Sequence, residues 1–183
     1  MPAYRRWYVP GGTYFFTLVA QDRCPIFTTR LGLACLRLAW RVVRQRWPFE
    51  TVAAVALPDH LHAVWSLPSG DDRYSLRLSR FKEIFTRTYL SRGGEESGRT
   101  DSRIQRRERG VWQRRFWEHV CRDEADLQEK VDDIHWNPVK HGIVSSVQDY
   151  PHSTFRRFVR LGEYPPDWGN ALELGQFANL NWE

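Results

Sequence analysis

Two histidines flank a single leucine in the segment Pro58-Asp59-His60-Leu61-His62. The residues that follow, Ala63-Val64-Trp65, predict a β-strand. Because residues i and i+2 of a strand point to the same face, the two imidazoles share one side while the leucine points into a core on the other. This arrangement forms half of a metal site, but histidines at a strand end are often only solvated or hydrogen-bonded. The spacing alone therefore leaves both interpretations open.

Asp133 and Asn137 are a second pair of polar residues with regular spacing. They stand at i and i+4 of an expected helix and so share one of its faces, while Val131 and Ile134 would face the core. From the pattern alone, a solvated helix face is the simpler interpretation of this pair.

Apolar periodicity predicts the elements that must position these residues. Strands are expected at 13–19, 51–57, 61–67 and 116–121. Helices are expected between Thr29 and Pro48, over 74–90, and over 123–137, where Pro138 should end the last one. The order strand-helix-strand-strand-helix-strand plus an extra helix predicts an α+β, ferredoxin-like fold. Its four-stranded antiparallel sheet would carry two helices on one face.

Length and composition indicate a single domain of 183 residues. Residues 91–110 are polar and basic, which predicts a mobile surface insertion, and the tail 147–183 is expected to wrap around the domain. The three cysteines contain no CxxC pair, so neither a disulfide framework nor a thiolate zinc site is supported. We find no apolar signal region or membrane-length segment. The expectation is a soluble, intracellular, basic domain.

The net charge is +5, and many of the arginines stand beside aromatic residues. Arginine neutralises phosphates and aromatic rings stack on unpaired bases, so this pattern favours single-stranded or structured nucleic acid over plain duplex. For any single arginine, an ordinary solvated face is the simpler explanation. The candidate DNA-binding residues are Arg5, Arg6, Arg77, Arg80, Lys82, Arg87, Arg114 and Arg115.

Several motifs, taken in order, resemble the REP-associated tyrosine transposases, which belong to the single-tyrosine enzymes with an HUH motif (U is an apolar residue). The similar segments are Tyr4-Arg5-Arg6-Trp7-Tyr8, Leu57-Pro58-Asp59-His60-Leu61-His62, Phe81-Lys82-Glu83-Ile84-Phe85, Val111-Trp112-Gln113, Asn137-Pro138-Val139-Lys140-His141-Gly142 and Asp149-Tyr150-Pro151-His152-Ser153. Such a series is far more specific than one His-x-His pair.

The resemblance implies a ferredoxin-like fold that cleaves and rejoins single-stranded DNA at REP hairpins. In the family, a tyrosine on the helix after the fourth strand attacks a phosphodiester, which gives a 5′-phosphotyrosine link and a free 3′-hydroxyl. The resemblance also implies a divalent metal held by His60, His62 and Asn137. An imidazole and oxygen ligand set suits Mn²⁺, or Mg²⁺ through its waters, better than Ca²⁺. A monomer that acts in the cytoplasm, associated with the nucleoid, would follow.

The chain departs from the family pattern at Asp133, which stands where the family has its nucleophilic tyrosine. Attack by a carboxylate would give an acyl phosphate that water hydrolyses readily, so rejoining would be lost. Three hypotheses remain: an active transposase, a hairpin-DNA binding protein that has lost cleavage, and an RNA-binding ferredoxin-like domain. The third would need exposed aromatic residues on the sheet.

Overall fold

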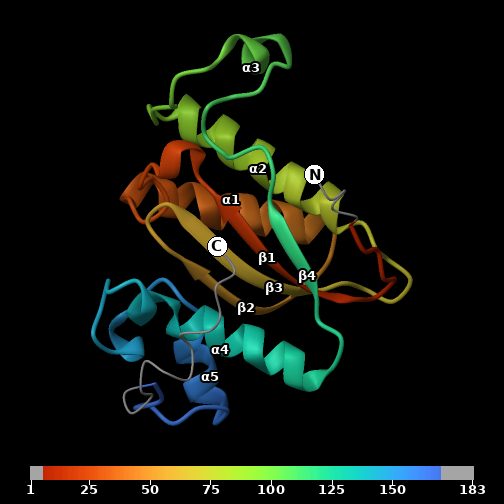
Figure 1. Ribbon diagram of the computed structural model, residues 1–183, viewed down its shortest axis with the longest axis vertical. Helices are drawn as coiled ribbons and strands as arrows, with labels where there is room; N and C mark the ends of the chain where they lie inside the picture. Colours follow the sequence, from red (N-terminus) through yellow and green to blue (C-terminus); the bar gives the residue numbers. More distant parts are fainter. Residues whose placement is uncertain (1–5, 170–183) are drawn as a thin grey trace, which may run out of the picture.

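Four strands form one antiparallel sheet in the order β2-β3-β1-β4 (Figure 1). The computed structural model describes residues 6–169. The strands are β1 (Thr13–Val19), β2 (Glu50–Ala56), β3 (His60–Ser66) and β4 (Trp117–Val120). β2 and β3 form the expected hairpin, whose register pairs Val55 with His62 and Ala56 with Leu61. The α+β class and the four-stranded antiparallel sheet are therefore as predicted.

Two helices cover one face of this sheet, namely α1 (Arg30–Arg46) and α2 (Tyr74–Ser91). Thr29 begins α1 as its N-cap, because its side chain accepts a hydrogen bond from the Gly32 amide. Alternate strand residues point into this layer, as the pleat requires. Its core includes Tyr14, Phe16, Leu18, Leu61, Ala63 and Trp65.

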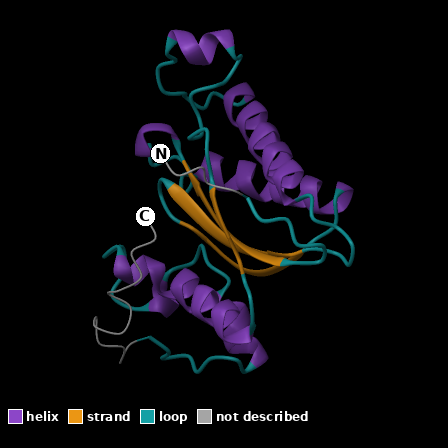
Figure 2. Ribbon diagram, turned by 45° about the vertical axis from the view of Figure 1, so that its right-hand side comes forward, coloured by secondary structure: helices purple, strands orange, loops and turns teal. Residues whose placement is uncertain are grey.

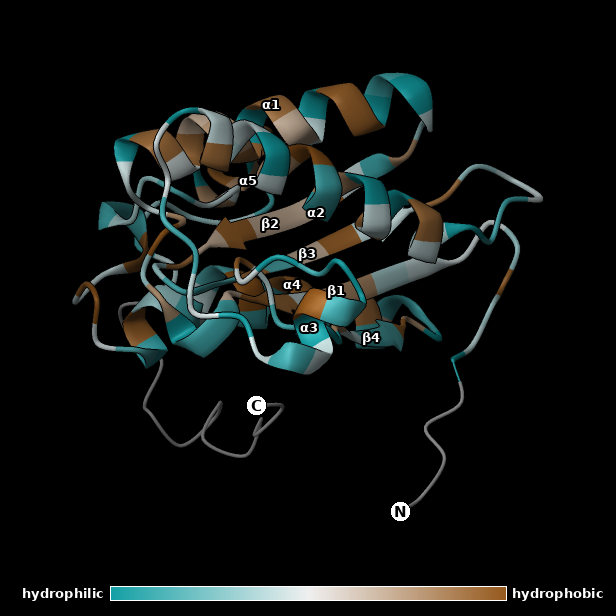
Figure 3. Cartoon of the chain, turned by 90° about the horizontal axis from the view of Figure 1, so that it is seen from above, coloured by the Kyte–Doolittle hydropathy of each residue, from teal (hydrophilic) through white to brown (hydrophobic). Residues whose placement is uncertain are grey.

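The opposite face is covered by α4 (Glu124–Lys140) and α5 (Phe155–Leu161), so the sheet lies between two helical layers (Figure 2). A second core cluster fills this side, with Phe15 and Val64 from the strands and Ile134 from α4. In Figure 3, β2 and β3 are hydrophobic, while the covering helices alternate between hydrophobic and hydrophilic positions. Because helices cover both faces, the sheet offers no open aromatic surface of the kind that the RNA-binding hypothesis needs.

The sequence predicts that α4 ends before Pro138. In the structure the helix instead continues to Lys140. A proline inside a helix lacks the N–H that would bond one turn back. Losing this hydrogen bond costs little here because α4 continues for only two residues after Pro138. The His141 amide donates to the Asn137 carbonyl at 2.9 Å and closes the last turn. Burial of Trp136 and Pro138 supports the same geometry.

The segment 91–110 contains a short helix, α3 (Asp101–Gln105), and has its own polar contacts. Glu96 accepts hydrogen bonds from Arg109 and from the Gly110 amide, which ties the two ends of the loop together. The 3-10 turns η1 (Gln21–Arg23) and η2 (Val147–Asp149) complete the elements.

Residues 152–154, within the segment expected to form the tail, cover the open edge of β2. The Ala56 amide donates to the His152 carbonyl, and the Thr154 amide donates to the Ala54 carbonyl, each at 2.9 Å. Unpaired strand edges favour aggregation, so this contact protects the sheet. Residues 170–183 of the expected tail lie outside the described residues.

Candidate metal and DNA site

The two histidines lie together on the α4 side of β3, and Leu61 points to the other core, as predicted. Their ring centroids are 5.0 Å apart. His60 Nδ1 lies 2.6 Å from a carboxylate oxygen of Asp59, and His62 Nδ1 lies 2.9 Å from the Thr17 hydroxyl on β1. With the proton on Nδ1, each ring donates to its neighbour and keeps the Nε2 lone pair available.

Both Nε2 atoms are buried and lack a hydrogen-bond partner among residues 6–169. Burial lowers the pKa of His60, against the opposing effect of Asp59. Burial lowers the pKa of His62 well below its ordinary value, and His60, His141 and Lys140 lower it further when they are protonated. Both rings are therefore neutral near pH 7, which is the form that binds a metal.

Asn137 supplies a third unpaired polar atom from α4. Its side chain is 2% exposed, and its Oδ1 has no hydrogen-bond partner in the described part of the chain. Helix α4 packs against β2 and β3, and its C-terminal end reaches the histidine pair. There the His141 ring centroid lies 5.1 Å from that of His60. The sequence prediction gave His141 no role, since the helix was expected to stop short of it.

Buried polar atoms without partners are rare in folded proteins, so three of them on adjoining elements need an explanation. Two imidazole nitrogens and one amide oxygen fit a divalent ion of the Mn²⁺ or Mg²⁺ class, with its other positions left to oxygen ligands. No group of three His, Cys, Asp or Glu residues within 6–169 is placed to hold a metal. Asp133 therefore does not join the histidines as a ligand, and Asn137 would be required.

Asp133 lies one turn before Asn137 on α4 and is 5% exposed. Its Oδ1 has no hydrogen bond among the described residues, and the Lys140 ammonium lies 3.7 Å from it. Burial raises the pKa of this carboxyl, although Lys140 and Lys130 act in the opposite direction. A carboxylate held this way is a poor neighbour for a phosphodiester, since both groups are anionic.

The structure contradicts one DNA-binding prediction, because Arg77 is 1% exposed. Its guanidinium forms a bidentate ion pair with Asp71, with N–O distances of 2.9 and 3.0 Å. The remaining donors bind the carbonyl oxygens of Trp47, Pro48 and Arg73. This arginine joins the start of α2 to the loop after α1, so it has no group left for a phosphate.

The other basic candidates divide by location. Lys82, Arg87 and Arg114 line one hollow of about 530 Å³ between α2 and the residues before β4. Lys82 is also structural, since its ammonium donates to the Gln113 carbonyl at 2.6 Å, and burial lowers its pKa to about 8.

Arg6, Arg80 and Arg115 do not line this hollow. Arg6 lies over the Phe116 ring and 3.7 Å from Glu118. Arg80 is exposed and pairs with Glu83, and Arg115 is exposed. Arg5 lies outside the described residues. Of the predicted basic residues that the structure describes, only Lys82, Arg87 and Arg114 therefore line this hollow.

Comparisons with known proteins agree with the resemblance. No protein-family model matches the chain. A Haemophilus influenzae protein classed with the REP-associated tyrosine transposases is 44% identical over 174 residues, 95% of this chain and 97% of the relative. The REP-associated tyrosine transposase of Escherichia coli K12 is 41% identical over 173 residues, covering 94% and 93%.

A solved structure of a REP-associated tyrosine transposase bound to a REP hairpin matches the fold with a TM-score of 0.77. It is 41% identical, and the match covers 92% of this chain and 91% of that one. No helix within 6–169 is both long and apolar enough to cross a membrane. Since identity above 40% extends over nearly the whole length, the chain belongs to the family of REP-associated tyrosine transposases.

Proposed function

We propose that this protein binds REP-type hairpins of single-stranded DNA, holds a divalent metal with His60, His62 and Asn137, and forms little or no covalent link to DNA. The similarity to the hairpin-bound relative supports the first part. The three buried donor atoms without partners support the second. The third part, that little or no covalent link forms, rests on the buried carboxylate of Asp133, which stands where the family resemblance places a tyrosine hydroxyl.

In this proposal the chain's own residues prepare the site. Asp59 and Thr17 orient the two imidazoles and keep their Nε2 atoms free to bind. The metal, when bound, would polarise the phosphate and offset its charge. Without a tyrosine hydroxyl the protein would recognise and hold the hairpin but leave its backbone intact. Such a protein would act as a monomer in the cytoplasm, on chromosomal DNA.

Hairpin binding is tested by comparing a palindromic hairpin that carries a short single-stranded foot with a random duplex of equal length. We expect the hairpin to bind at least about 100-fold more tightly at physiological salt, because specific complexes commonly exceed non-specific ones by 10³ or more. Fluorescence anisotropy over a salt series measures both affinities. Equal affinity for the two probes would overturn the proposal.

Metal binding is tested by thermal unfolding with and without Mn²⁺. At 100 times the dissociation constant, a ligand of the folded state stabilises it by about 2.7 kcal/mol. For a chain of this size, that raises Tm by roughly 5–10 °C. His62→Gln should remove the shift, whereas His152→Gln, on a residue outside the metal site, should keep it. A shift that survives in both His62→Gln and Asn137→Ala would place the metal elsewhere.

A further inference from the structure

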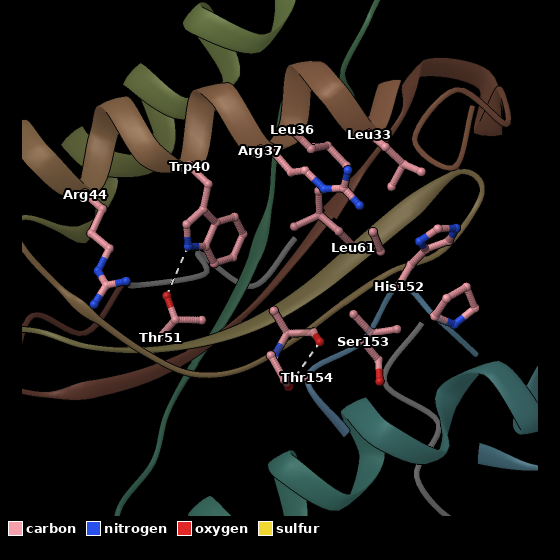
Figure 4. A pocket seen from close by; sticks show the side chains of 14 residues that line it. Leu33, Leu36, Arg37, Trp40, Arg44, Thr51, Leu61, His152, Ser153 and Thr154 are labelled. Atoms are coloured by element: carbon pink, nitrogen blue, oxygen red, sulfur yellow. Dashed lines mark hydrogen bonds between the residues drawn. The ribbon is translucent and has the colours of Figure 1, made fainter. Parts of the chain in front are cut away.

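A groove lies between α1 and the edge strand β2, on the face of the sheet opposite the two histidines (Figure 4). Its volume is about 370 Å³. The apolar floor includes Leu36 and Leu61, and the segment 151–154 forms one wall. That wall is fixed to β2 by the backbone hydrogen bonds of residues 152–154 described above. The groove is therefore built into the fold and does not depend on a loose loop.

Three arginines stand along the groove on α1, namely Arg37, Arg41 and Arg44. All three are exposed, and their spacing of four and three places them on one helix face. Among residues 6–169, no carboxylate lies within ion-pair distance of any of them. Other exposed arginines, such as Arg80 and Arg109, pair with glutamates. The three guanidinium groups of this α1 stripe (Arg37, Arg41 and Arg44) therefore repel one another, and no carboxylate in the described part of the chain offsets their charge.

A tryptophan stands between these arginines. The Trp40 indole donates to the Thr51 hydroxyl on β2 at 3.0 Å, which fixes the ring at the side of the groove. Figure 4 shows Arg37 and Arg44 extending from α1 toward the sheet on either side of this ring. A second hollow of about 550 Å³, bounded by the same residues with Arg41 and Gln45, continues along the helix.

The dimensions suit one strand of nucleic acid. Arg37 and Arg44 are seven residues apart, which is about 10 Å along a helix. Phosphates of one strand are at least about 3.4 Å apart along a duplex axis, so the stripe can face up to about four of them, and fewer where the strand is more extended. A fixed indole beside an apolar hollow is the kind of surface on which an unpaired base stacks. A paired duplex presents no free base to it.

We propose that this α1 groove binds a single strand of DNA at a site separate from the metal centre. The arginines would neutralise successive phosphates, and one unpaired base would enter the hollow beside Trp40 and His152. The inference rests on the proposed DNA binding and extends it. It gives the protein a second contact on the far side of the sheet, suited to a strand that leaves the hairpin or belongs to a neighbouring site.

The test compares the double variant Arg37→Gln/Arg44→Gln with the control Arg30→Gln/Arg46→Gln. Both remove two positive charges from exposed positions of α1, but the control residues do not line the groove. Three labelled probes are used: a 12-nucleotide single strand, a blunt hairpin, and the same hairpin with a single-stranded extension. Thermal unfolding confirms that both variants remain folded.

We expect the groove variant to bind the single strand and the extended hairpin at least about 10-fold more weakly, with a salt slope reduced by about 1.4 for two lost contacts. Its affinity for the blunt hairpin should stay within about twofold. Equal losses in groove and control variants, or equal losses on blunt and extended hairpins, would overturn the inference.

Two further outcomes separate the proposals. If the wild-type protein binds no hairpin, the proposed function fails, and the 12-nucleotide strand still decides whether the groove binds DNA. If polyglutamate displaces that strand as effectively as unlabelled DNA of equal charge, the groove takes acidic polymers without selecting DNA, and the inference is wrong.

Discussion

Replacing Asp133 with tyrosine is expected to produce a protein that links itself covalently to hairpin DNA in the presence of Mn²⁺. The tyrosine oxygen would attack phosphorus, the bond to the 3′ oxygen would break, and the 3′-hydroxyl would leave with the proton. Lys140, whose ammonium lies 3.7 Å from the present carboxylate, would favour the ionised phenol. Loss of an essential nucleophile costs many orders of magnitude in rate. Restoring it should raise adduct formation on the order of 10⁴-fold above wild type.

Adduct formation is measured as a labelled band that survives denaturing electrophoresis. The matched control is Asp133→Phe, which adds the same ring without its hydroxyl and should give no band. Adding His62→Gln to the tyrosine variant should remove most of the gain, since the metal ligand set is then incomplete. A strong band from the wild-type protein would show that another residue acts as nucleophile, and peptide mapping would locate it.

The sequence predicted most of the frame because alternation and turn residues report directly on which side of a strand is buried. His60 and Leu61 lie on the faces that the period of two requires. The edge contact made by residues 152–154 could not be predicted, since it joins β2 to a segment about 100 residues later through backbone groups that any residue carries. The prediction that the helix ends at Pro138 was wrong, because the packing of α4 outweighed the local preference of a helix to end before proline.

Only some residues of the candidate sites could be identified from the sequence. Asn137 was assigned through resemblance, and the structure adds an independent reason in its buried, unpaired oxygen. Its neighbour His141 was missed because the helix was expected to stop earlier. Arg37 and Arg44 were not singled out, because on a helix they look like an ordinary solvated stripe. Only the groove beside them, and the absence of carboxylates near them within 6–169, distinguishes that stripe.

Arg77 shows why a basic residue on an amphipathic helix does not identify itself. Neither its spacing nor its neighbours reveal that Asp71 approaches it from the preceding loop. The same guanidinium also binds the carbonyl oxygens of Trp47 and Pro48, so it satisfies backbone groups where α1 ends. Its role in this structure is to join three segments of the chain.

Arg77→Met should therefore lower the free energy of unfolding by about 3 kcal/mol, since it removes the bidentate partner of Asp71 and leaves the carbonyl oxygens of Trp47 and Pro48 without their donor. Arg80→Met, on the exposed side of the same helix, should change it by less than about 0.5 kcal/mol. Chemical denaturation measures both. Arg77 and Arg73 hold the pKa of the Asp71 carboxyl well below its usual range. The difference in the free energy of unfolding between wild type and Arg77→Met should accordingly narrow as the pH falls below about 3.8. In that range the Asp71 carboxyl takes up a proton in the unfolded chain before it does so in the folded protein.

The same variant separates a structural role for Arg77 from a DNA contact. At a temperature where Arg77→Met remains folded, its salt slope for hairpin binding should equal that of wild type, because a side chain that is 1% exposed cannot release a counterion from a phosphate. A slope reduced by about one, with stability unchanged, would return Arg77 to the DNA surface and contradict the burial described here. Lost stability with an unchanged slope would show that the guanidinium is used entirely within the fold.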